Sequence, residues 1–221
     1  MPEPKVVPAT GAVMDPTRIK QKVELQMTAV IDDARGASEK VLLASSFEPS
    51  ESLNADDFKN AFRNLPAGVS LITADDGTHT AALTATSVAS ISADPPLLLF
   101  SLSGLSSAAP VIGNAETVVV HLLTADELHL AKLGSTSGVD RFADTSQWTR
   151  LTTGEPVFHE AKTWIRGRVL NLLQAGNSTI VLVHALAPGT KVGEELGEDT
   201  SDPLVYHNRT WHGLCEASRV K

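Results

Sequence analysis

Small hydroxyl side chains are concentrated in the stretch from Ala82 to Leu102, and they are the clearest candidates for binding chemistry in this chain. Thr84, Thr86 and Ser87 are interleaved with apolar residues, a pattern typical of a strand whose two faces differ. Small side chains leave the backbone accessible, so a flat polar ligand can lie close and bond to N–H, C=O and hydroxyl groups. The stretch therefore predicts a ligand-binding strand.

A second group of candidates lies just beyond this stretch. Ser106 and Ser107 stand at the start of a short helix expected over 106–113, where free N–H groups favour a phosphate; a plain N-cap is the other reading. Arg141, in a loop expected over 135–148, can grip a phosphate with two N–H groups or form a surface salt bridge. A phosphorylated ligand is one consistent interpretation.

Other chemistries lack their motifs. The chain has neither a Gly-x-Gly-x-x-Gly after a strand nor a phosphate-loop lysine, and 104–108 departs from the esterase elbow at its final glycine. No pair of its histidines has metal-binding spacing on a helix, so we expect no metal site and read His121 as a hydrogen-bonded core residue. Cys215 is the only cysteine, which excludes an intrachain disulfide. No catalytic acid or base stands out.

Composition narrows the class of partner. A net charge of −8 and an aromatic content of 5% disfavour binding to nucleic acid or to anionic membranes. No apolar run reaches membrane-spanning length, and the start Met-Pro-Glu-Pro is not a signal peptide. We therefore expect a cytoplasmic globular protein.

The chain divides into an extension and one main domain. Residues 1–54 form the expected N-terminal extension, with a disordered start, an amphipathic helix over 15–36 and a polar linker. Residues 55–221 form the main domain, which opens with a short helix capped by Asn54. Strands dominate and no βαβ alternation occurs, so the pattern predicts a mainly β protein with short peripheral helices, built as a split or closed antiparallel barrel. The expected strands are 69–73, 82–92, 97–100, 117–123, 163–173, 179–186, 204–206 and 210–214.

A series of short motifs in a fixed order resembles the flavin reductase-like domain family, whose fold is the FMN-binding split barrel. The resemblance covers roughly residues 56 to 214. Its pieces are Pro66-Ala-Gly68-Val-Ser-Leu-Ile-Thr73, Leu83-Thr-Ala-Thr-Ser87, Ser90-Ile-Ser-Ala-Asp-Pro-Pro96, Ser101-Leu-Ser103, Ser106-Ser-Ala-Ala, Asp140-Arg-Phe142, Gly154-Glu-Pro156 and Pro203-Leu-Val-Tyr206.

The resemblance implies a homodimeric NAD(P)H:flavin oxidoreductase that binds FMN, with FAD as the alternative, at the subunit interface. Hydride passes from the nicotinamide, of NADH or NADPH, to the flavin, and reduced flavin serves a separate monooxygenase. The matched flavin contacts are Thr84, Ala85, Thr86 and Ser87 at the ring and ribityl chain, Ser101, Leu102 and Ser103 beside them, and Ser106, Ser107 and Ala108 at the phosphate, with Arg141 a further candidate.

One departure from the family concerns the nicotinamide. Many members carry Gly-Asp-His where this chain has Gly176-Asn177-Ser178, and that histidine is commonly placed near the nicotinamide. Serine can donate a hydrogen bond but carries no charge, so we expect weaker positioning of the cofactor at Ser178. Two alternatives stay open: a split-barrel flavoprotein that retains FMN for another redox or sensing role, and a scaffold for another ligand such as haem.

Overall fold

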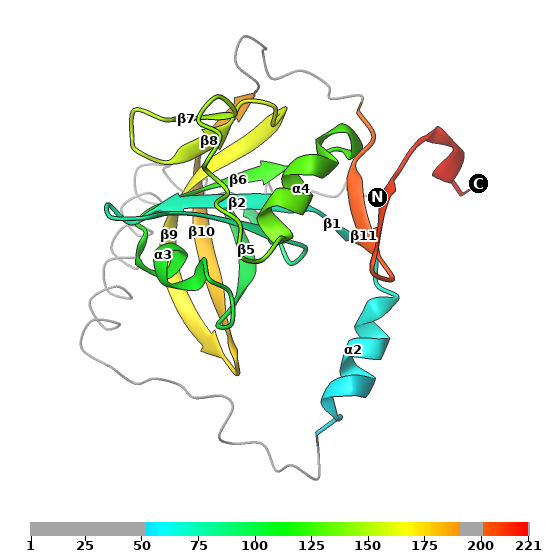
Figure 1. The fold of residues 1–221 in the computed structure, drawn as a ribbon. Coiled ribbons are helices and arrows are strands. Elements are labelled where there is room, and N and C mark those ends of the chain that lie inside the picture. Colours follow the sequence, from blue (N-terminus) through cyan, green and yellow to red (C-terminus); the bar gives the residue numbers. More distant parts are fainter. Residues whose placement is uncertain (1–51, 191–200, 221) are drawn as a thin grey trace, which may run out of the picture. The chain divides into compact units, whose positions relative to one another are not determined.

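The computed structural model describes residues 52–190 and 201–220, which form a mainly antiparallel β fold (Figure 1). Residues 1–51 of the predicted extension and the acidic loop at 192–200 lie outside the described residues, so the expectations for them stay predictions. No helix in the described ranges is long and apolar enough to cross a membrane.

The main sheet of the described chain is antiparallel throughout, in the order β3-β2-β6-β9-β10-β5-β4. Its strands are β2 (Ser70–Asp75), β3 (Thr80–Ala85), β4 (Ala89–Ala93), β5 (Pro96–Ser103), β6 (Thr117–Leu122), β9 (Thr163–Ala175) and β10 (Ser178–Thr190). The long hairpin of β9 and β10 turns at Gly176, whose φ of +59° suits glycine. The predicted mainly β, antiparallel class is confirmed.

Two smaller sheets accompany the main one. The first has the order β1-β11-β12. Its strands are β1 (Ala67–Gly68), β11 (Leu204–His207) and β12 (Thr210–Gly213). A short hairpin of β7 (Trp148–Arg150) and β8 (Pro156–Phe158) forms the second. Backbone bonds from Val69 N to Leu204 O and from Leu204 N to Leu123 O tie the first small sheet to the main one.

The helices are short. They are α2 (Ala55–Arg63), α3 (Ala109–Asn114), α4 (Leu128–Ser135) and the 3-10 turns η3 (Ala125–Glu127) and η4 (Glu216–Ser218). Asn54 caps α2 as predicted, since its side-chain oxygen accepts the N–H groups of Asp56 and Asp57 at 3.1 and 2.9 Å. Helix α4 lies against β3 and β2 (Figure 1).

Two predicted boundaries were wrong. The strand expected over 82–92 is interrupted, because the chain leaves the ladder at 86–88 between β3 and β4. The helix expected from Ser106 starts only at Ala109. Ser106 instead forms a turn, in which its carbonyl accepts the Ala109 N–H and its hydroxyl accepts the Ala108 N–H. This local side-chain bond competes with the helix.

Strand β2 is buried on both of its faces and separates two apolar clusters. Ile72 belongs to a cluster that includes Phe100, Ile112 and Val181. The neighbouring Leu71 points to the opposite face, where the second cluster contains Leu130, Phe158 and Leu204. Successive side chains of a strand point to opposite faces, so β2 anchors both cores and fixes the positions of β3 and β6 beside it.

Candidate functional site

The predicted ligand-binding residues come together along the ends of β3 and β5. We call residues 84–88 and 101–108 the hydroxyl strip. Ser87 joins its two halves, because its hydroxyl accepts the Ser101 N–H at 2.9 Å. Thr86 and Ser87 are both exposed, directly after the last residue of β3. The strip therefore presents hydroxyl and backbone groups to solvent where the sequence predicted a ligand.

Not every residue of the strip offers its side chain. Thr84 donates its hydroxyl to the Ala131 carbonyl of α4 at 2.7 Å, so this group already serves packing. The close approach of α4 needs Gly134, since a Cβ there would lie 2.4 Å from the Thr84 hydroxyl. The buried side chains of three further residues leave only their backbone for a ligand: Ala85, Leu102 and Ala108.

The other end of the strip is a turn rich in serine. The Ser103 hydroxyl accepts the Leu105 N–H at 3.3 Å, and the Ser103 carbonyl accepts the Ser106 N–H at 3.0 Å. Ser107 is exposed beside them. Two serine hydroxyls and the exposed Ser107 thus lie within one short turn, an arrangement that suits a phosphate through neutral donors.

Ser178 lies at this serine-rich end. It pairs with Ser103 across the ladder between β10 and β5, and the Gly104 N–H donates to the Asn177 carbonyl at 2.9 Å. Within one chain, Ser178 is therefore next to the predicted phosphate end of the strip.

Arg141 forms no salt bridge within the described residues and donates instead to backbone carbonyls. Its Nε and Nη2 donate to the carbonyls of Gly134 and Thr136 at 3.3 and 2.9 Å. These carbonyls belong to the C-terminal end of α4, where a cation is favourable. Arg141 holds the end of the helix that packs on Thr84, and any contact with a ligand stays a prediction.

A cavity of about 480 Å³ opens beyond the end of β3, and no sequence motif marks it. We call it the β6 pocket. Its walls come from β1, β2, β6, the segment before β11 and Val88 of the strip. The lining residues are Gly68, Val69, Ser70, Val88, Leu122, Leu123, Thr124, Thr163, Ser201, Pro203 and Leu204. Because these residues come from segments far apart in sequence, no motif could have marked them.

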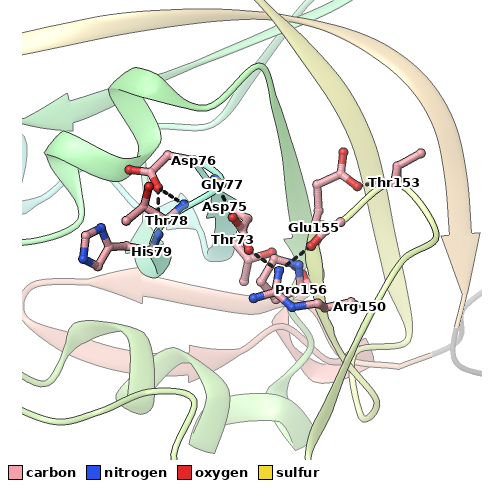
Figure 2. Close-up of polar contacts among 11 residues, drawn as sticks. Thr73, Asp75, Asp76, Gly77, Thr78, His79, Arg150, Thr153, Glu155 and Pro156 are labelled. Carbon is pink, nitrogen blue, oxygen red and sulfur yellow. Dashed lines mark hydrogen bonds and ion pairs between the residues drawn. The ribbon is translucent and has the colours of Figure 1, made fainter.

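A charged cluster lies at the opposite end of β2 (Figure 2). We call Asp75, Arg150, Thr153, Glu155 and Arg166 the Glu155 cluster. Arg166 Nε donates to Glu155 at 2.8 Å, Arg150 pairs with Asp75, and Arg150 also donates to the Gly154 carbonyl at 2.8 Å. A polar cavity of about 370 Å³ lies beside it.

The protonation of the Glu155 cluster follows from its partners. Burial alone would raise the pKa of Glu155, but hydrogen bonds from Thr117 and Thr153 and the charge of Arg166 outweigh it and lower the pKa. Glu155 is thus an ionised, fully partnered carboxylate. It is suited to holding β8 against the main sheet rather than to accepting a proton.

His121 is another buried titratable group, and it is a core residue as predicted. Its Nδ1 lies 2.9 Å from the Leu71 carbonyl, and its Nε2 accepts the Phe158 N–H at 3.3 Å. Burial lowers its pKa to about 4, although the bond to Leu71 opposes this shift. Both nitrogens serve the core, so His121 is not available to a substrate.

The residues of the strip fit a flat phosphorylated ligand better than a metal ion. Within residues 52–190 and 201–220 no three metal-binding side chains lie together. The strip combines small side chains, exposed backbone and hydroxyls in a row from Thr86 to Ser107, which matches a ring, a polyol chain and a phosphate. FMN has these three parts.

Comparisons with known proteins point the same way. A family model described as the flavin reductase like domain matches residues 62–214. An NADH:FMN oxidoreductase from Rhodococcus qingshengii is 38% identical over 175 residues, which cover 77% of this chain and 87% of the relative.

Two solved structures share the fold and confirm the predicted split barrel. A flavin reductase domain protein from Arthrobacter sp. FB24 superposes with a TM-score of 0.66 at 30% identity, covering 73% of this chain and 96% of that one. The flavin reductase component of a bacterial two-component tryptophan halogenase gives a TM-score of 0.63 at 26% identity, covering 73% and 98%.

Proposed function

This chain belongs to the flavin reductase-like domain family, and we propose that it reduces FMN with NADH as the electron donor. The observation that carries the proposal is the 38% identity to an NADH:FMN oxidoreductase, extending over 87% of that relative. The hydroxyl strip supports it, because its residues match the parts of FMN in order. FMN supplies the electron-accepting ring; the protein supplies binding, alignment and exclusion of water.

The roles along the strip follow from what each residue leaves free. Thr86 and Ser87 offer exposed groups to the ring and ribityl chain, whereas Thr84 and Ala85 offer backbone only. Ser101, Leu102 and Ser103 line the middle. Ser106, Ser107 and the backbone of Ala108 hold the phosphate in the turn before α3.

The overall reaction needs no acid or base from the strip. A C–H bond at C4 of NADH breaks, and its electron pair moves with the hydrogen to FMN, while one proton comes from solvent, giving NAD⁺ and reduced FMN. Arg141, the charged residue proposed for the strip, already donates to the carbonyls of Gly134 and Thr136, so we assign it no role in proton transfer. The protein acts by bringing two rings together.

We place a second copy of the chain on the outer face of β5, β9 and β10. Leu99 and Leu182 oppose each other on this face, and Ile180 opposes Leu173, which is 41% exposed. Helices α3 and α4 lie against β2 and β3 instead. An apolar face on three strands favours burial in a homodimer. Light scattering should give a dimer that Leu182→Glu converts to a monomer; a wild-type monomer with bound FMN would refute this assembly.

The reduced flavin is destined, in this proposal, for a second protein. The structural relative from the tryptophan halogenase system is the reductase component of such a pair. A flavin-dependent monooxygenase is the partner that the family suggests. Retention of FMN for another redox or sensing role is the competing outcome.

Anaerobic mixing of the protein with FMN and NADH tests the function directly. Flavin absorbance should bleach with turnover and return when air is admitted. Protein with tightly held FMN that NADH does not bleach would favour the retained-flavin alternative. A purified protein that binds no flavin would contradict the proposal.

A further inference from the structure

One lining residue of the β6 pocket, Thr124, has a buried hydroxyl that makes no hydrogen bond within residues 52–190 and 201–220. Thr124 is 5% exposed, and its backbone N–H donates to the Glu127 carboxylate at 2.7 Å. Its hydroxyl oxygen faces the Glu127 N–H in a capping box, yet the hydroxyl makes no hydrogen bond of normal geometry within the described residues. Burying an unsatisfied hydroxyl costs stability, so its retention points to a ligand acceptor.

The pocket adjoins the ring end of the hydroxyl strip. Val88, one of its lining residues, directly follows Ser87. Ser70, another, pairs with Ala85 on one side and with Leu122 on the other. A group in the β6 pocket would therefore lie next to a flavin ring held at Thr86 and Ser87.

Ser178 pairs with Ser103, at the phosphate end of the strip. It lies two residues along β10 from Ile180, which pairs with Ser101, the residue bonded to Ser87. The residues of the β6 pocket are therefore further candidates for contacts to the nicotinamide at the ring end within one chain.

We propose that the β6 pocket binds the nicotinamide ring of NADH and that the Thr124 hydroxyl donates a hydrogen bond to its carboxamide oxygen. This inference rests on the proposed function. The ring is flat and apolar on both faces, which matches walls that include Val69, Val88 and Leu123. A carboxamide has an acceptor oxygen and a donor NH2 group, and the residues that line the pocket include Ser70 and Thr163, whose hydroxyl type can serve both.

The cavity size agrees with this assignment. A volume of about 480 Å³ lies within the range of small-molecule sites. A nicotinamide in the β6 pocket would adjoin the flavin ring expected at Thr86 and Ser87, as hydride transfer between the two rings requires. Thr124 would act as a substrate-binding residue that orients the amide.

Thr124→Val is the decisive variant, because valine keeps the shape and removes the hydroxyl. We expect the KM for NADH to rise about three- to tenfold, with the same weakening of 1,4,5,6-tetrahydro-NAD, a non-reactive analogue, measured by titration of the FMN-loaded protein. FMN affinity should stay unchanged. The melting temperature should stay level or rise, since an unsatisfied hydroxyl is lost. Thr124→Ser should retain analogue binding, and Thr210→Val, at an exposed site on β12, should match wild type.

A second variant narrows the pocket without a clash. A Cβ added at Gly68 would meet no atom within 4 Å, so Gly68→Val should fold normally and obstruct the pocket. It should weaken the analogue more than Thr124→Val does. Weaker FMN binding with unchanged analogue binding would assign the pocket to the flavin and overturn the proposal. Unchanged analogue binding in both variants, with brisk FMN reduction, would overturn it while the proposed function stands. A wild-type protein that binds no analogue and oxidises no NADH would overturn both.

Discussion

The two ends of β2 bury polar groups in opposite ways. At its first residue, Ser70, the strand borders the β6 pocket, where the Thr124 hydroxyl makes no hydrogen bond in the described part of the chain. At its last residue, Asp75, it enters the Glu155 cluster, where both carboxylates meet an arginine. The charged groups at the Asp75 end therefore pair with one another, whereas the Thr124 hydroxyl at the Ser70 end makes no hydrogen bond within the described residues.

This difference distinguishes polar side chains that stabilise the fold from polar side chains that are suited to binding a ligand. Paired charges with satisfied hydrogen bonds hold elements together and are costly to break. A lone buried donor beside an apolar cavity costs stability unless something fills the cavity. If the proposal for Thr124 holds, the charged cluster is a poorer guide to the functional site in this protein than a single buried threonine.

The largest effect should come from unpairing the Glu155 cluster. Arg166→Met leaves the Glu155 carboxylate, only 2% exposed, without its cation. We expect a loss of about 3 kcal/mol in the free energy of unfolding, measured by urea titration at neutral pH. Arg219→Met is the matched control, because its partner Glu216 is exposed, and it should cost less than about 0.5 kcal/mol. Equal losses would show that the cluster is not a structural anchor.

Thr86→Leu should have the next largest effect, and it should act on the ligand alone. Thr86 is exposed and makes no side-chain hydrogen bond within the described residues, so the change leaves the fold intact. An isobutyl group there blocks close approach to the backbone. We expect FMN affinity, followed by fluorescence quenching, to fall about a hundredfold, or about 2.7 kcal/mol. Thr86→Ser should bind FMN normally; unchanged affinity in Thr86→Leu would remove this part of the strip from the site.

Local chemistry made parts of the fold predictable from sequence. The Asn54 cap and the turn at Gly176 depend on residues only a few positions apart, and the structure has both. The interruption at 86–88 was missed, because hydroxyl and apolar residues continue to alternate through it and only the pairing with other strands ends.

The site was predictable only where it follows one segment. The hydroxyl strip lies within a single stretch of sequence and could be proposed from residue types. The β6 pocket needs Gly68, Val88, Thr124, Thr163 and Pro203 to meet, which depends on sheet order. The missing partner of Thr124 is a property of packing, and no residue pattern encodes it.

A pH effect of intermediate size should come from His121, which lies between the two ends of β2. Its pKa of about 4 in the fold is below the ordinary value of 6.5, so the unfolded chain binds more protons between these values. Stability therefore falls as pH drops through this window, by about 2.5 kcal/mol between pH 7.5 and 4.5. His121→Gln should remove that part of the slope in urea titrations at several pH values. A slope unchanged by the substitution would assign the acid loss to carboxylates alone.

The smallest effect should come from restoring the histidine that the family commonly carries. Ser178 lies opposite Ser103, at the phosphate end of the strip, so a histidine there would meet phosphate groups rather than the nicotinamide ring in the same chain. We expect Ser178→His to lower the KM for NADH about tenfold, because an imidazole can donate to a pyrophosphate and carries charge when protonated. The gain should fade as pH rises above about 6.5, where imidazole is neutral. In the double variant, the effects of Ser178→His and Thr124→Val on the KM for NADH should be additive in free energy if the two residues act on different parts of NADH. If the gain disappears in the Thr124→Val background, both residues act on the same part of NADH. That result would contradict the assignment of Ser178 to the phosphate end of the strip and Thr124 to the ring end.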